Sequence, residues 1–172
     1  MKDKQIYITK PDFDRLTEII KNMRSRQEID RRSLDELEHS FSSRDELGLI
    51  KEARKLKNSR NDVEWARIEE LAAELDRATV VESDKVPQDI VTMNSKVCLK
   101  DMDTDKDEIY QVVYPEDADI EQNKISILAP IGTAILGYRA GDVIEWKVPA
   151  GLRRFKIKKI LYQPEAAKDY HL

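Results

Sequence analysis

The sequence predicts an α+β protein in which an N-terminal antiparallel helical hairpin, of the coiled-coil type, precedes a small, mainly β domain. No glycine occurs before Gly48, and apolar residues in this half recur at alternating spacings of three and four. After Pro87 the apolar period becomes two, as in strands. Charged residues make up 37% of the chain and aromatic residues 6%, so part of it must be a solvated helix. We place the hairpin at 1–80, a linker at 81–93 and the β domain at 94–172.

The first predicted helix begins near Thr9, which can cap it, with Pro11 and Asp12 in the first turn. Its apolar stripe consists of Phe13, Leu16, Ile20, Met23, Leu34, Leu37 and Phe41. Gln27 and Asp30 interrupt this stripe at its middle. The pattern therefore predicts a coiled-coil helix with a polar centre.

The predicted turn lies at Ser42 and Ser43, because the stripe stops there and Ser43 can cap a second helix. The second stripe consists of Leu47, Ile50, Ala53 and Leu56 near the turn and Ile68, Leu71, Leu75 and Ala78 at the far end. The predicted pairs are Phe13 with Leu75, Leu16 with Leu71, Ile20 with Arg67 and Ile68, Gln27 with Arg60, Asp30 with Lys57 and Leu37 with Ile50. Apolar ends meet and polar centres meet, which favours one hairpin over residues 12–78 with arms of about 45 Å.

The β domain follows Pro87, which cannot continue a helix. The predicted strands are 96–99, 108–113, 124–128, 142–148 and 154–162, and a short helix is predicted at 131–136. Turn residues at 103–106 and 149–151 separate strands. This half is therefore expected to fold as one small domain.

Composition excludes several classes of protein. The formal net charge of −4 argues against a protein that grips nucleic acid alone. We expect a cytoplasmic protein, because no apolar run is long enough to span a membrane and the start lacks the apolar core of a signal peptide. Cys98 is the single cysteine and the two histidines are His39 and His171, which excludes an internal disulfide and disfavours a zinc cage.

Several segments of the second half resemble the C-terminal domain of the Gre transcription factors. They are SKV at 95–97, YQVV at 110–113, PEDAD at 115–119, KISILAPIGTAILG at 124–137, GD at 141–142 and VPAG at 148–151. PQDIVTMNS at 87–95 and YQPEAAKDY at 162–170 are similar to the branch named regulator of nucleoside diphosphate kinase. That branch typically has a much shorter hairpin, so this chain departs from it in its first half.

The resemblance implies an FKBP-like fold for the β domain, without isomerase activity, and binding to RNA polymerase. In the Gre family the hairpin enters the secondary channel of the polymerase, and a loop of the C-terminal domain contacts the channel rim. That loop corresponds to Ala129, Pro130 and Ile131, where cleavage factors often have serine in place of Ala129. Pro130 has a plain alternative role as the first residue of the short helix.

Gre cleavage factors carry Asp-x-x-Glu at the hairpin tip and help hold a magnesium ion in the polymerase active site. The predicted tip has Asp45 and Glu46 instead, without that spacing, and the matching pair Asp35 and Glu38 lies further back on the first helix. Asp45 and Glu46 can hold Mg²⁺ jointly with polymerase, or they can simply complement a helix N-terminus. We favour the second interpretation.

The sequence thus predicts a monomeric regulator of transcription elongation that is not itself an enzyme and has no cofactor of its own. It would occupy the secondary channel, or modulate transcript cleavage there, with indirect contact to nucleic acid. Stimulation of cleavage through tip-bound Mg²⁺ is the alternative. Regulation of a nucleotide kinase is a second alternative, although the five glycines form no phosphate-binding loop. Basic side chains on the arms have two interpretations, contact with RNA or channel wall and ordinary coiled-coil solvation, and we favour solvation.

Overall fold

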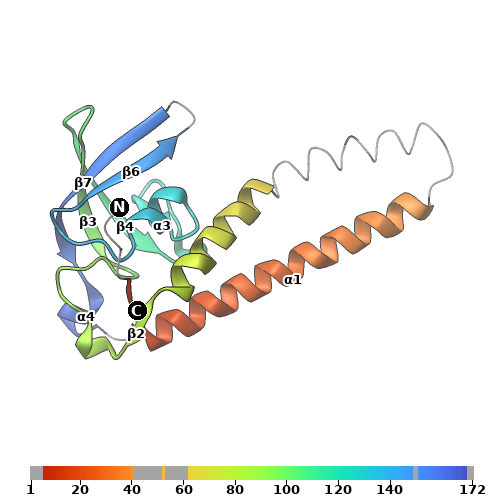
Figure 1. The fold of residues 1–172 in the computed structure, drawn as a ribbon, viewed down its shortest axis with the longest axis horizontal. Coiled ribbons are helices and arrows are strands. Elements are labelled where there is room, and N and C mark those ends of the chain that lie inside the picture. Colours follow the sequence, from red (N-terminus) through yellow and green to blue (C-terminus); the bar gives the residue numbers. More distant parts are fainter. Residues whose placement is uncertain (1–5, 41–51, 53–61, 149–150, 170–172) are drawn as a thin grey trace.

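The chain folds as an α+β protein in which a long helix projects from a mainly β domain. The structure is a computed structural model that describes residues 6–40, 52, 62–148 and 151–169. In Figure 1 the long helix α1 (Lys10–Ser40) leaves the domain at one corner, and a second helix lies beside its base. We call this second helix, described over residues 62–76, the return helix. The fold class predicted from the sequence is confirmed.

The start of α1 is capped as predicted. The Thr9 hydroxyl accepts a hydrogen bond from the Asp12 amide at 3.2 Å and donates one to the Asp12 carboxylate at 2.8 Å. This arrangement satisfies an amide that the first turn of a helix leaves without a partner. The cap therefore ends any extended structure at Thr9 and sets the direction in which α1 leaves it.

The apolar ends of the two helices meet as predicted. Leu16 and Ile20 of α1 are buried in one cluster with Ile68, Leu71 and Leu75 of the return helix. Burying side chains of this size stabilises the base by roughly 1.5 to 3 kcal/mol each. The predicted turn at residues 42 and 43 lies outside the described residues.

A short parallel pair of strands, which the sequence analysis did not anticipate, closes the base of the hairpin. Strand β1 (Tyr7–Thr9) precedes α1, and β2 (Thr79–Val81) follows the return helix. The pair runs in parallel register from Tyr7 with Thr79 to Thr9 with Val81. Both ends of the hairpin are therefore tied together by backbone hydrogen bonds.

The segment predicted as a linker is packed rather than loose. It contains the short 3-10 helix η1 (Ser83–Lys85). Four of its apolar side chains are buried, namely Val86, Ile90, Val91 and Met93. A segment with so many buried side chains belongs to the core and cannot act as a flexible tether.

The β domain is a five-stranded sheet with the order β5-β4-β3-β7-β6. Its elements are β3 (Lys96–Asp101), β4 (Asp107–Val113), η2 (Pro115–Asp117), β5 (Lys124–Ser126), α3 (Pro130–Ile135), β6 (Val143–Val148), β7 (Gly151–Tyr162) and α4 (Pro164–Ala167). All neighbours are antiparallel except β4 and β5. The five strands and the short helix agree with the prediction to within three residues at each end.

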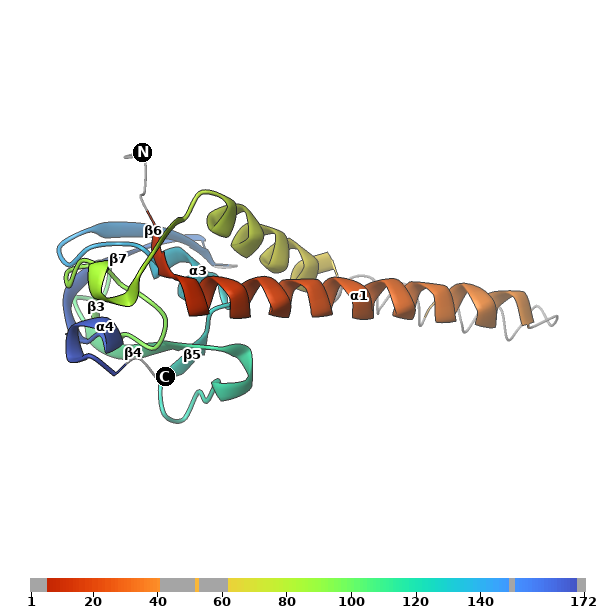
Figure 2. The ribbon, with the colours of Figure 1, turned by 90° about the horizontal axis from the view of Figure 1, so that it is seen from below.

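One continuous apolar core joins the hairpin to the β domain. The cluster that holds Leu16 and Leu71 also holds Val97 and Ile157 from the centre of the sheet. Gly137, at φ +76°, allows the N-terminal segment to approach, because a Cβ there would lie 2.7 Å from Ile6 Cγ1. In Figure 2, α3 lies between the sheet and the base of the hairpin. The base of the hairpin is thus part of the domain, whereas the rest of α1 extends beyond it.

Candidate functional site

The loop between β5 and α3 is the predicted polymerase contact, and the structure changes which of its residues present a surface. Leu128, Ala129 and Pro130 are partly exposed. Ile131 is only 7% exposed and belongs to the apolar core. The idea that an apolar residue beside Pro130 is presented to a partner is therefore wrong for Ile131. Pro130 does begin α3, so its plain structural role is present.

Hydrogen bonds hold this loop in one shape. The Ser126 hydroxyl and carbonyl accept bonds from the amides of Leu128, at 3.1 Å, and Ala129, at 2.9 Å. The buried Thr133 hydroxyl donates to the Ile127 carbonyl at 2.5 Å. Because both ends are anchored, the three partly exposed side chains form a small preorganised surface.

Gly132 lets α3 lie directly on strand β5. A Cβ at this position would be 2.2 Å from the Ser126 carbonyl oxygen, which is far inside van der Waals contact. Glycine is therefore required for close packing rather than for an unusual backbone angle. This packing sets the height of the loop above the sheet.

The outer part of α1 is the second candidate functional element. From Lys21 to Glu36, every side chain whose burial is described is exposed except Met23 and Gln27, which are half-buried. An all-round polar helix of this kind is either solvated or reserved for a partner. The predicted tip residues Asp45 and Glu46 lie outside the described residues, as does the side chain of Glu38.

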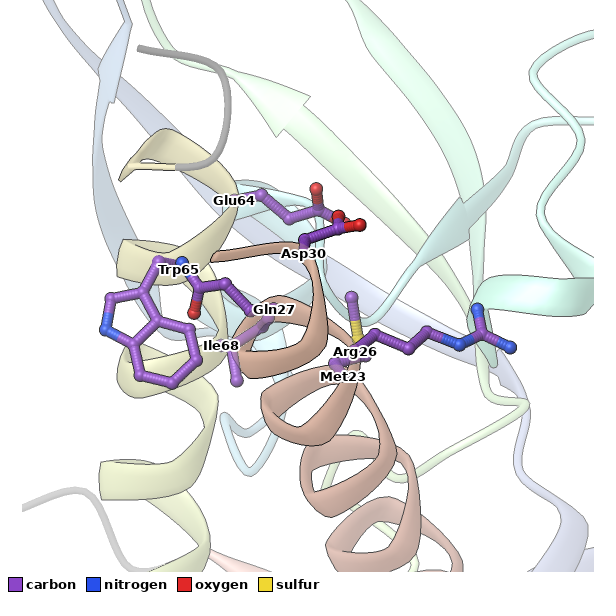
Figure 3. A pocket seen from close by; sticks show the side chains of 7 residues that line it. All are labelled: Met23, Arg26, Gln27, Asp30, Glu64, Trp65 and Ile68. Atoms are coloured by element: carbon purple, nitrogen blue, oxygen red, sulfur yellow. The ribbon is translucent and has the colours of Figure 1, made fainter. Parts of the chain in front are cut away.

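A groove of about 200 Å³ lies between the two helices where the apolar stripe ends. Figure 3 shows Trp65 on the return helix and Gln27 on α1, and Asp30 and Glu64 also line the groove. The predicted polar centre is therefore present. Its neighbours on the return helix, Glu64 and Trp65, lie about one and a half to two turns beyond the predicted partners Lys57 and Arg60, which are outside the described residues.

Ion pairs occupy part of the basic surface of α1. Arg24 bonds Glu69 at 2.8 Å and lies 5.8 Å from the centre of the Trp65 ring, and Arg32 bonds Glu28 at 2.8 Å. Exposed pairs such as these are typical of solvated helices and stabilise them little. This favours the interpretation of the basic cluster as solvation, and Trp65 packs against the core as expected.

Four side chains connect the first turns of α1 to the end of β4, and we call them the joint cluster. Tyr114, 2% exposed, donates its hydroxyl to the carboxylate of Asp12, 8% exposed, at 2.5 Å. The guanidinium of Arg15 lies 3.6 Å from the centre of the Tyr114 ring and bonds Glu116 at 2.6 Å. The cluster therefore consists of a buried hydrogen bond flanked by a partly exposed ion pair.

Burial sets the electrostatics of the joint cluster. It raises the pKa of Asp12, although the hydrogen bonds from Tyr114 and Thr9 oppose that shift. Burial likewise raises the pKa of Tyr114, whose neighbour Asp12 adds to the effect. The hydrogen bond from Arg15 lowers the pKa of Glu116. Because Tyr114 is the donor to one oxygen of this buried carboxylate, the contact is sensitive to small displacements.

The sequence analysis named Asp12 only as a first-turn residue and Glu116 only within the PEDAD segment, and it did not connect them. Asp12 and Tyr114 are 102 positions apart, and no local pattern pairs residues at that distance. The one available signal was a tyrosine directly before Pro115, at the end of a strand. The joint cluster is therefore a finding of the tertiary structure.

The two stretches similar to the regulator of nucleoside diphosphate kinase lie against each other. The Thr92 hydroxyl donates to the buried carboxylate of Glu165 at 2.7 Å. The Gln163 amide donates to the carbonyls of Pro87, at 2.9 Å, and Ile90, at 2.8 Å. Burial raises the pKa of Glu165. The tail thus closes over the packed segment that follows the hairpin.

The described part of the chain contains no candidate for a metal site or for a membrane-spanning helix. None of its clusters of histidine, cysteine, aspartate and glutamate has three members placed to hold a metal ion. No helix among the described residues is long and apolar enough to cross a membrane.

Comparisons with known proteins agree with this architecture. The family model described as "Transcription elongation factor, GreA/GreB, C-term" matches residues 86–162. The regulator of nucleoside diphosphate kinase of Escherichia coli K12 is 40% identical over 103 residues, which cover 59% of this chain and 76% of the relative. The transcription elongation factor GreA of Thermosipho africanus is 28% identical over 159 residues, which cover 91% of this chain and 97% of the relative.

A solved structure matches along almost the whole chain. The GreA/GreB transcription elongation factor from Nitrosomonas europaea superposes with a TM-score of 0.59 at 31% identity, covering 92% of this chain and all of that one. The match includes the helical half as well as the β domain. The chain therefore belongs to the GreA/GreB family of transcription elongation factors, within which it joins a C-terminal domain similar to the regulator of nucleoside diphosphate kinase to a long N-terminal helical hairpin.

Proposed function

We propose that this protein binds RNA polymerase and regulates transcription elongation from the secondary channel. The β domain docks at the channel rim through the surface formed by Leu128, Ala129 and Pro130. The hairpin enters the channel and occupies it. This proposal retains the predicted loop but replaces Ile131 with Leu128, because Ile131 is buried.

The observation that carries the proposal is that the outer half of α1 is polar and exposed, while its first turns are packed in the core of the β domain. Helix α1 has 31 residues, so at about 1.5 Å per residue it is about 46 Å long. Its first turns share the core of the β domain, while its outer half exposes charged side chains. Such an arm reaches far from a docking surface without burying apolar area of its own.

Two versions of channel entry make different demands on the tip. Occupancy needs only the length and shape of the hairpin. Stimulated cleavage needs carboxylates that hold Mg²⁺ together with polymerase, and Asp45 and Glu46 are the candidates. Adjacent carboxylates do not reproduce the Asp-x-x-Glu spacing of cleavage factors, and Asp35, which does have a glutamate three residues later, lies exposed on α1. We therefore favour occupancy.

Copurification tests the choice of partner. Tagged full-length protein, mixed with purified core RNA polymerase and separately with nucleoside diphosphate kinase, should retain polymerase and not the kinase. Retention of the kinase alone would contradict the proposal and support the second alternative.

A cleavage assay then separates the two versions. Backtracked elongation complexes are incubated with this protein alone, and then with a true cleavage factor plus an excess of this protein. Occupancy predicts no cleavage in the first reaction and inhibition in the second. Rapid cleavage in the first reaction would favour magnesium delivery, and no effect in either reaction would contradict channel entry.

A further inference from the structure

The joint cluster contains hydrogen bonds whose strength depends on the direction of α1. It lies beside an apolar core whose stability depends much less on that direction. Apolar contacts between Leu16 and the sheet stabilise the base, but hydrophobic burial tolerates small rotations. A hydrogen bond weakens steeply when its angle or length changes. The Tyr114 to Asp12 contact is therefore much more sensitive to the direction of α1 than the surrounding core is.

Each oxygen of the Asp12 carboxylate has one donor, from a different part of the chain. Thr9 supplies a donor from the start of the helix itself, and Tyr114 supplies one from the end of β4. If α1 rotated away from β4, one carboxylate oxygen would lose its donor while still buried. Leaving a buried charged group without a partner is among the costlier changes a protein can undergo.

Arg15 and Glu116 restrict rotation of α1 about a second axis. The Arg15 side chain starts one turn beyond Asp12 on α1, stacks on the Tyr114 ring and reaches Glu116 on η2. Stacking of a planar guanidinium on a ring restricts both position and tilt. Two contacts at different heights along the same helix resist rotation in a way that one contact alone would not.

The length of α1 amplifies any change at this point. From Arg15 to Ser40 the helix rises about 38 Å, so a rotation of about 10° at its base displaces its end by about 7 Å. The docking surface at Leu128 to Pro130 belongs to the same domain as Tyr114. The direction of the hairpin relative to that surface is therefore set close to the joint cluster.

We propose that Asp12, Arg15, Tyr114 and Glu116 are positioning residues that fix the direction of the hairpin relative to the docking surface. Disrupting them leaves a folded chain whose hairpin points in a wider range of directions. The consequence in the channel rests on the function proposed above, whereas the geometric statement concerns the free protein and stands independently.

The test measures the direction of the hairpin in the full-length free protein. Spin labels are attached at Ile29→Cys on α1 and Val143→Cys on β6, which are 63% and 46% exposed in the parent chain. Cys98 is buried and stays in place, and the parent chain without introduced cysteines controls for labelling there. Double electron–electron resonance then gives the distribution of distances between the two labels.

Three variants and one matched control are compared in this labelled protein. Tyr114→Phe removes only the hydroxyl, Arg15→Ala removes the stacking and the ion pair, and Glu116→Gln weakens the ion pair at an exposed position. We expect a broadened or shifted distribution for each, smallest for Glu116→Gln. The control Arg32→Ala breaks an exposed ion pair on the same helix, and should leave the distribution unchanged.

Thermal melts ensure that only folded protein is interpreted, and Glu116→Gln remains usable if Tyr114→Phe or Arg15→Ala fails to fold. Distributions as narrow as the parent's, with the same mean, in all folded variants would overturn the inference. So would a control that broadens equally. Failure of the proposed function looks different, because the parent chain would then not bind core polymerase whatever its distance distribution. With polymerase, Tyr114→Phe should keep its affinity and lose inhibition of cleavage.

Discussion

Removing the Tyr114 hydroxyl should destabilise the folded chain by about 2 kcal/mol at pH 7, because a hydrogen bond to a charged group contributes roughly 1.5 to 3 kcal/mol. Both partners are almost fully buried, so water cannot replace the lost donor. The perturbation is Tyr114→Phe, which keeps the ring under Arg15. Urea unfolding of parent and variant, followed by circular dichroism, gives the difference.

The stability that Tyr114→Phe loses should increase as the pH rises. Burial raises the pKa of Asp12 in the folded chain above the ordinary 3.8. Such a group contributes stability that is complete below about 3.8 and is lost as the pH rises through the folded pKa. The Tyr114 donor opposes this loss because it stabilises the charged form. The Tyr114→Phe variant should therefore lose more stability at pH 7 than at pH 4.

A double-mutant cycle assigns this effect to the pair. Asp12→Asn removes the charge of the carboxylate. In this variant, loss of the Tyr114 hydroxyl should lower the free energy of unfolding by less than in the parent chain, and the coupling energy between the two residues should be about 1 to 2 kcal/mol. Glu165 also titrates nearby, and the charge of Asp12 contributes to its raised pKa. Comparing differences between variants at each pH largely cancels its contribution.

An exposed tyrosine–aspartate pair supplies the matched control. Tyr162 donates to Asp169 at 2.6 Å near the surface, so Tyr162→Phe should change the unfolding free energy little. A Tyr114→Phe variant no less stable than Tyr162→Phe would refute the reasoning. Equal losses at pH 4 and pH 7 would refute the assignment to the charged carboxylate.

Three further changes test other parts of the molecule. Ala129→Asp puts a residue that suits the N-cap position of α3 on the docking surface but adds a charge there, so polymerase affinity should fall about tenfold or more without a lower melting temperature. Ala129→Ser also suits the N-cap position and should bind normally, and equal binding of both variants would move the interface elsewhere. Gly132→Ala should lower the free energy of unfolding by about 1 to 3 kcal/mol, measured in urea, because its Cβ meets the Ser126 carbonyl; an unchanged midpoint would contradict the tight packing. Changing Asp45 and Glu46 together to alanine should leave affinity and inhibition of cleavage nearly unaltered, whereas loss of a stimulated cleavage reaction would favour magnesium delivery.

Local sequence patterns were sufficient for the two long helices, α3, the five strands of the main sheet and the family. Thr9 and Pro11 marked the start of α1, the spacing of Leu16 and Ile20 identified its buried face, and alternation located all five strands of the sheet. These features follow from helix and strand periods and from capping chemistry, which act over a few residues. The ordered motifs of the β domain likewise lie within short segments, so they could be identified without a structure.

Contacts between distant segments needed the tertiary structure. Strands β1 and β2 are short and are stabilised only by each other and by the core, so their three-residue patterns carried no signal. Ile131 follows an exposed-looking proline but turns inward because Gly132 brings α3 onto the sheet. Tyr114 meets Asp12 across 102 residues because the base of α1 packs against the β domain. A periodic pattern specifies which face of an element is apolar, but shape, volume and hydrogen-bond geometry in the assembled core determine which faces meet.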